Sequence, residues 1–177
     1  MPDYIAFLRA INLGATRKFA KADVIAATEA AGMTDVQTHL NTGNVRLTST
    51  RRSSAAVRRD LERAYETDRG FAVPTVVFTP EEVRAITARG EELRPENVDG
   101  ARHYIQLLHE PPGQDAIDAV HALSAPGEQI IVEGRAAYAL IGSVHDSRLL
   151  RTKEYVSLGE GTSRTISVLK AIVEKWC

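Results

Sequence analysis

The sequence predicts an α+β protein made of two ferredoxin-like (βαββαβ-type) subdomains with an additional C-terminal helix. Three observations predict it. Residues 1–90 read as strand, helix, two strands, helix, strand and helix; residues 91–100 form a polar connection with proline and glycine; and residues 103–141 repeat strand, helix and two strands. The expected subdomains are therefore residues 1–90 and residues 91–177.

The first subdomain alternates apolar segments with turn-forming ones. Its expected strands are "DYIAFLRAI", "DVQTHL", "VRLTS" and "PTVVFT", and the turn "NTGN" joins the middle two strands into a hairpin. The helix of "KADVIAATEAAG" is expected to stop at Gly32, and Ser53 or Ser54 can cap a second helix. These elements complete one βαββαβ set.

Later segments predict further helices and strands. Thr79, Pro80 and Glu82 have the spacing of a capping box with a first-turn proline, so a helix is expected to start there and to end at Gly90. Strand "HYIQLLH", helix "QDAIDAVHAL" and hairpin "QIIVEGRAAYALIG" follow. The terminal helix carries an apolar stripe of Ile166, Leu169, Val173 and Trp176.

Composition excludes several classes of protein. The chain has 177 residues, 44% of them hydrophobic, with no run of the roughly 20 apolar residues that a membrane span needs and no signal-peptide pattern. We therefore expect a cytoplasmic protein. A net charge of −1 and an aromatic content of 6% argue against nucleic acid as a partner. Cys177 is the only cysteine, which excludes an intramolecular disulfide.

The charges are unevenly distributed along the chain. Residues 1–70 carry 11 Lys and Arg against 8 Asp and Glu, residues 71–134 carry 4 against 11, and residues 135–177 carry 7 against 4. Basic ends could steer an anionic ligand towards them, although solvated charged faces explain the same pattern.

Motifs for metals and cofactors are missing from the sequence. None of the five histidines stands four residues from another, and neither phosphate-binding glycine motif follows a strand. Ser143, His145 and Asp146 lie within four residues, whereas the members of a catalytic triad converge from separate segments. We expect no metal and no cofactor, and no catalytic residue can be named.

Five polar residues are expected to meet at one edge of the first sheet. In a βαββαβ sheet, strands one and three are antiparallel neighbours, which brings Arg9 and Asn12 near Asn41, Thr42 and Asn44. Turn formation accounts for much of the asparagine and glycine here. Turn formation does not account for Arg9. A cation at the end of an apolar strand needs an anionic partner, from this chain or from a ligand.

The segment "GEGTSRT" before the terminal helix is the second candidate. As a helix start it could bind an anion, or Thr162 or Ser163 could simply cap the helix. Capping does not explain Arg164, whose charge opposes the positive end of a helix dipole. We therefore place Arg164 with Arg9 among the expected ligand-binding residues.

These segments resemble a known family. "FLRAINLGA" is similar to the LLRGINVGG start, "HLNTGNVRL" to the TYIQSGNV turn, and "GTSRTISVLKAI" to the TTRNWNTVxKL close, of the domain-of-unknown-function family 1697. The resemblance implies a bacterial protein with two ferredoxin-like subdomains and supplies no reaction. This chain has Ala10 in place of a family glycine, and Thr165 and Ile166 in place of Asn-Trp.

The function expected from the residues is binding of a small anionic ligand in a cleft between the subdomains. Two alternatives stay open: an enzyme of unknown reaction that uses the same cleft, and a structural or interaction protein that acts as a homodimer. The identity of the ligand does not follow from the sequence.

Overall fold

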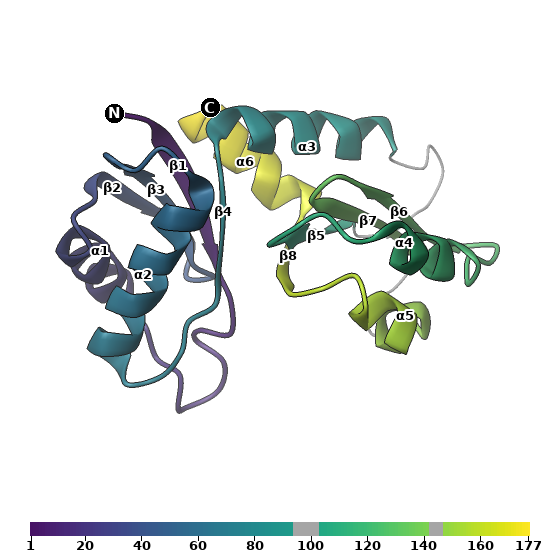
Figure 1. Cartoon of the computed structure of the whole chain (residues 1–177), viewed down its shortest axis with the longest axis horizontal. Helices are drawn as coiled ribbons and strands as arrows, with labels where there is room; N and C mark the ends of the chain where they lie inside the picture. The colour runs from purple at the N-terminus through teal and green to yellow at the C-terminus, as the bar shows by residue number, and fades with distance from the viewer. Residues whose placement is uncertain (94–102, 142–146) are drawn as a thin grey trace. The chain divides into compact units, whose positions relative to one another are not determined.

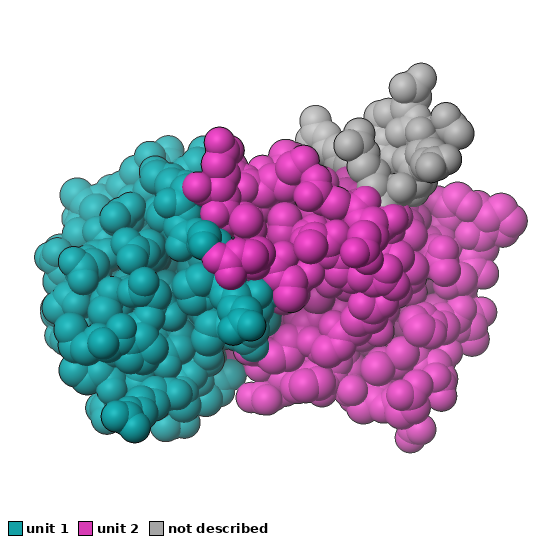
Figure 2. Space-filling view, turned by 90° about the horizontal axis from the view of Figure 1, so that it is seen from above, with its two compact units in different colours: residues 1–83, 175–177 teal, residues 84–174 magenta. Residues whose placement is uncertain are grey.

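The computed structural model describes residues 1–93, 103–141 and 147–177 of the chain. It divides into two compact units, residues 1–83 with 175–177 and residues 84–174, which Figure 2 colours separately. Most of the expected connection at residues 91–100 lies outside the described residues, as do Ser143, His145 and Asp146. In the described residues, no helix is long and apolar enough to cross a membrane.

Unit 1 is a four-stranded antiparallel sheet with two helices packed on it (Figure 1). The strand order is β2-β3-β1-β4, the order expected from the sequence for strands one and three as neighbours. Its elements are β1 (Asp3–Leu8), α1 (Lys21–Ala30), β2 (Thr34–His39), β3 (Asn44–Thr48), α2 (Ser54–Arg69) and β4 (Thr75–Phe78).

One face of this sheet and the inner faces of α1 and α2 form the core of unit 1. Alternate residues of β1, such as Tyr4 and Leu8, share a buried cluster with Val57, Leu61 and Tyr65 of α2. The period of two on the strand and of three to four on the helix is what places these side chains together. The start of α2 is as the sequence predicts: Ser53 Oγ accepts from the Ala56 amide at 3.1 Å.

Helix α3 (Pro80–Glu92) starts with the expected capping box. Thr79 Oγ1 accepts from the Glu82 amide at 3.2 Å, and the Glu82 carboxylate accepts from the Thr79 amide at 2.7 Å. The expected stop at Gly90 is wrong, because α3 runs on to Glu92. Gly90 instead allows close packing: a Cβ there would lie 2.8 Å from both Ile105 Cδ1 and Ile166 Cδ1.

Unit 2 has a second four-stranded antiparallel sheet, in the order β6-β7-β5-β8. Its elements after α3 are β5 (Tyr104–Leu108), α4 (Gln114–His121), β6 (Glu128–Glu133), β7 (Ala136–Ile141), the 3₁₀ turn η1 (Leu149–Arg151), α5 (Lys153–Val156), β8 (Gly161–Thr165) and α6 (Ile166–Trp176). Its core joins Leu108, Ile130, Val120 and Leu158 from strands, helix and loop. The mixed α+β class predicted from the sequence is confirmed.

The expectation that "GEGTSRT" starts a helix is wrong, because residues 161–165 form strand β8. This strand pairs with β5 over five residues, and a Cβ at Gly161 would collide with the Leu107 carbonyl oxygen. Thr165 takes the capping position expected for Thr162 or Ser163: its Oγ1 accepts from the Val168 amide at 3.4 Å. Arg164 therefore lies in a strand, directly before the residue that caps α6.

Candidate functional site

The end of β1 meets the β2–β3 turn in unit 1. Phe7 pairs with Asn44, and the Leu8 amide donates to the Gly43 carbonyl at 2.7 Å. Gly43 has φ 76°, and a Cβ there would lie 2.6 Å from Leu8 Cβ. This close approach requires glycine. The close approach of Leu8 and Gly43 places the 12-residue loop 9–20 beside the turn 40–43, as the sequence predicts.

Asn12 fastens this loop to the turn. Its Nδ2 donates to the carbonyls of Asn41 at 2.8 Å and Phe19 at 3.0 Å, and its Oδ1 accepts from the Phe19 amide at 3.0 Å. Asn12 itself has φ 54°, a left-handed conformation that asparagine adopts more readily than most residues. Its amide group is therefore committed to the shape of the site.

Arg17 fixes the far side of the loop. Its Nε donates to the Ala10 carbonyl at 2.6 Å and its Nη2 to the Ala72 carbonyl at 2.5 Å, and the guanidinium lies 4.6 Å from the centre of the Phe71 ring. This arginine therefore supports the backbone around Arg9.

The turn is shaped by its own side chains. Asn44 is buried, and its Nδ2 donates to the His39 carbonyl at 2.9 Å and to Thr42 Oγ1 at 3.1 Å. Asn41 accepts from Asn12 through its backbone carbonyl, so its exposed side-chain amide is not needed for that bond. Among the expected site residues in this turn, Asn41 is the one placed to offer its side chain to a ligand.

Exposed cations surround this sheet end. Arg9 follows β1 directly, Lys18 lies on the loop, and Lys21 is the first residue of α1. The two segments that meet here, residues 4–22 and 36–47, contain no Asp or Glu. The N-cap of α1 is Ala20, which makes no side-chain cap. Asp23 follows in the first turn of α1, where it pairs with Arg69 at 3.1 Å, so the two segments themselves carry a net positive charge.

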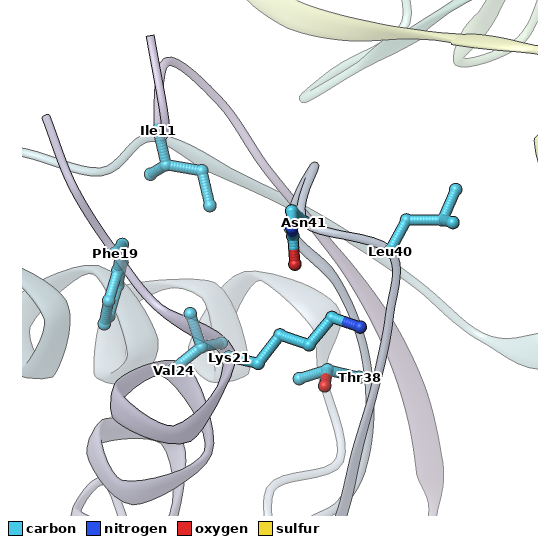
Figure 3. Close-up of a pocket in the computed structure, with 8 residues that line it drawn as sticks. Ile11, Phe19, Lys21, Val24, Thr38, Leu40 and Asn41 are labelled. Carbon is cyan, nitrogen blue, oxygen red and sulfur yellow. The ribbon is translucent and has the colours of Figure 1, made fainter. Parts of the chain in front are cut away.

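A narrow pocket of about 10 Å³ opens between loop and turn (Figure 3). Buried Ile11, Phe19 and Val24 line its inner part. The side chain of Lys21 extends from the start of α1 towards Thr38, Leu40 and Asn41. The pocket thus combines an apolar interior, which has room for about one water molecule, with a polar and cationic mouth.

Arg164 belongs to unit 2, whereas the other five expected site residues belong to unit 1. It is 8% exposed, and its Nη1 donates to Thr162 Oγ1 and to the Ser163 carbonyl, both at 2.8 Å. It pairs with Ile105 across β8 and β5. Burial disfavours the charged form and lowers the pKa of the Arg164 guanidinium to about 10.

Comparison with known proteins decides the family. The family model "Protein of unknown function (DUF1697)" matches residues 1–138. The chain belongs to this family. A solved structure described as that of conserved bacterial protein SP0830 from Streptococcus pneumoniae has a TM-score of 0.74 and 21% identity, and the match covers 99% of this chain and 98% of that one. At that identity the likeness shows the fold alone. No curated protein matches.

The departures from the family pattern have local structural effects. Ala10, which replaces a glycine, has φ 56°, a conformation that costs an L-residue about 1–2 kcal/mol. Thr165 caps α6, and Ile166 packs beside Gly90. Thr165 and Ile166 lie outside the residues that the family model matches, and both have a structural role in unit 2.

Sequence reasoning missed Lys21, Leu40 and the buried residues of the pocket. The sequence pattern places Lys21 at a helix start and Leu40 beside a turn, and neither position by itself indicates a ligand. The absence of acidic residues from 4–22 and 36–47 is the signal that could have drawn attention to this pair of segments.

Proposed function

We propose that this protein is a binding module for a small anionic ligand, with its main site where loop 9–20 of unit 1 meets the turn 40–43. One observation carries the proposal: exposed Arg9, Lys18 and Lys21 lie on one segment, residues 4–22, which contains no carboxylate, and Asp23, which follows it, is paired with Arg69. Cations that lack nearby carboxylates give a local positive potential, which concentrates an anion and speeds its association.

The groups of the site divide into those that shape it and those that offer contacts. Asn12, Asn44 and Thr42 use side-chain atoms to hold the loop and turn together. Lys21 and Asn41 reach the mouth of the pocket, and Arg9 stands exposed at the end of β1. A site preorganised in this way loses little entropy when the anion binds.

Arg164, in unit 2, is a further cation that we assign to anion binding. Its support is its burial in unit 2, because a desolvated guanidinium interacts more strongly with an anion than an exposed one does. We also infer that the two units, which share one strand order, are a ferredoxin-like duplication in a cytoplasmic bacterial protein.

The proposal is tested by thermal shift and calorimetric titration with inorganic phosphate, carboxylates, nucleotides and short RNA. The double substitution Arg9→Ala and Lys21→Ala should weaken binding of the anion that stabilises the protein by tenfold or more, since a hydrogen bond to a charged group contributes about 1.5–3 kcal/mol. The double substitution Arg52→Ala and Arg59→Ala removes two exposed cations elsewhere in unit 1 and is the matched control. Equal losses in both variants, or no anion that binds, would contradict the proposal.

A further inference from the structure

We propose that the groove between α1 and α2 of unit 1 is the interface of a homodimer, and that α1 of a second copy of the chain lies in it. The groove has a volume of about 800 Å³ and is lined by five alanines, two arginines, two aspartates and a threonine. It shares no residue with the pocket beside the turn 40–43, so this inference goes beyond the proposed function.

The two helices that form the groove run antiparallel on one face of the sheet of unit 1 (Figure 1). Asp23 near the start of α1 pairs with Arg69 at the end of α2 at 3.1 Å, and Thr28 Oγ1 lies 2.8 Å from Tyr65 Oη. Rising positions of α1 therefore meet falling positions of α2. This alignment places position 29 of α1 level with positions 63 and 64 of α2.

Alanines keep the groove open and leave the outer side of α1 apolar. Ala27 is buried at its floor, whereas Ala22, Ala26 and Ala30 are exposed and stand four residues apart on α1. Helix propensity does not require alanine there, because Lys, Glu, Arg and Gln are almost as favourable in a helix. The outer side of a surface helix is normally polar. An exposed apolar side next to an open groove is typical of a surface that a partner covers.

The spacing of the three exposed alanines fits this outer side of α1 to the groove of a second copy. Residues four apart form a ridge along a helix, and such ridges pack into grooves between the side chains of another helix. A ridge of alanines is low, so the backbones can approach closely. A two-fold axis along the helices places α1 of each copy in the groove of the other, and every contact then forms twice.

The charges favour a second copy over an anion as the occupant. The lining carries equal numbers of arginines and aspartates, which gives no net attraction for a polyanion. Arg51 and Asp60 already pair at 2.8 Å, whereas Glu29 and Arg63 are exposed and form no ion pair with the residues that the structure describes. The two-fold axis keeps Glu29 level with the partner's Arg63. Two ion pairs across the interface therefore complement the apolar contact.

Sedimentation velocity of the full chain over a range of concentrations tests the dimer. A helix of ten residues buries a small area, so we expect a weak dimer that forms as the concentration rises. Ala26→Glu places a carboxylate on the ridge and should weaken dimerisation about tenfold or more, because the charge would lose water in the interface. Ala55→Glu is the matched control, since Ala55 is exposed on α2 outside the groove. A chain that stays monomeric at every concentration, or equal dimerisation in both variants, would overturn the inference.

A charge exchange tests the placement of the second copy and uses two exposed residues whose substitution leaves the core intact. Glu29→Arg alone and Arg63→Glu alone should each weaken dimerisation several-fold, because like charges then face each other at two places. The double variant restores opposite charges and should dimerise nearly as well as the original chain. A purely structural role of either residue would not produce this recovery. Failure of the double variant to recover would refute the placement of α1 in this groove.

Discussion

The two units end their first strands in the same way and then differ. In unit 1 the Leu8 amide donates to the Gly43 carbonyl at 2.7 Å, and in unit 2 the Leu108 amide donates to the Arg135 carbonyl at 2.9 Å. In both, the first strand therefore meets the hairpin between the second and third strands of its sheet. The shared strand order brings this meeting about, so it carries no function by itself.

The two units differ in the loop that leads from the first strand to the first helix of the sheet. Unit 1 has twelve residues, 9–20, before α1, whereas unit 2 has five, 109–113, before α4. Among the described residues, the four non-glycine residues with positive φ all lie in unit 1, and three of them, Ala10, Asn12 and Leu40, are on this loop and turn. Backbone held in an unfavourable region needs support from its surroundings, and such support is typical of functional segments.

In unit 2 the side chain of Arg135 lies at the end of the first strand, β5. Arg135 Nε donates to the Leu108 carbonyl at 3.1 Å. Unit 1 has Gly43 near the same position of its hairpin, and the loop with its cations lies beside it. The comparison shows that the long loop is an addition to a strand order that both units share, which is why we propose the site in unit 1.

The largest expected effect is a difference in stability between substitutions of two hairpin glycines. Gly43→Ala should lower the free energy of unfolding by about 3–5 kcal/mol, because the new Cβ is strained at φ 76° and collides with Leu8 and Ile11. Gly134→Ala, at φ 55° with no atom within 4 Å of the new Cβ, should cost about 1–2 kcal/mol. Urea unfolding measures the free energy of unfolding of both variants. Equal losses would contradict the difference that we expect between the two hairpins.

The second effect tests the fastening of the loop. Asn12→Ala removes three hydrogen bonds at a positive φ and should cost about 2–4 kcal/mol. Asn41→Ala keeps the backbone carbonyl that accepts from Asn12, so its free energy of unfolding should change by less than about 0.5 kcal/mol. Hydrogen exchange of the Phe19 amide should rise in the first variant only. A stability loss in Asn41→Ala equal to that of Asn12→Ala would show that this bond does not fasten the loop.

The smallest effect on stability is expected at Arg164 in unit 2. Arg164→Met fills similar space without a buried charge, so the free energy of unfolding should change by less than about 1 kcal/mol, because replacing a buried ion by an apolar group is often neutral. If the guanidinium binds an anion within unit 2, the amide shifts that the anion causes around Arg164 should disappear in this variant, because a charged hydrogen bond is lost. Unchanged shifts around residue 164 in a folded Arg164→Met protein would remove this residue from the assignment.

Local signals in the sequence predicted much of the fold. Ser53 and the Thr79–Glu82 pair cap their helices as expected, because a cap depends on residues three positions apart. The βαββ order also predicted that the end of β1 meets the start of β3. These features need no knowledge of distant packing.

The predictions from sequence were wrong where the local structure depends on residues that are distant in the sequence. Gly161 and Thr162 resemble a helix start locally, but pairing with β5 makes them a strand. Gly90 resembles a helix stop, but it lies inside α3, where Ile105 and Ile166 pack too closely to leave room for a side chain. The burial of Arg164 and the pocket under Leu40 likewise depend on contacts that no local pattern encodes.

Mapping anion binding by amide chemical shifts tests the central claim most directly. Titration of the labelled chain with the anion that stabilises the protein in the thermal-shift screen should move the resonances of residues 9–21 and 38–43 of unit 1. The equivalent strand end of unit 2, residues 109–113 and 134–135, should stay unchanged and serves as the internal control. Saturable shifts in the unit 1 segments are the result we predict. Shifts of equal size at both strand ends, or none in unit 1, would contradict the account.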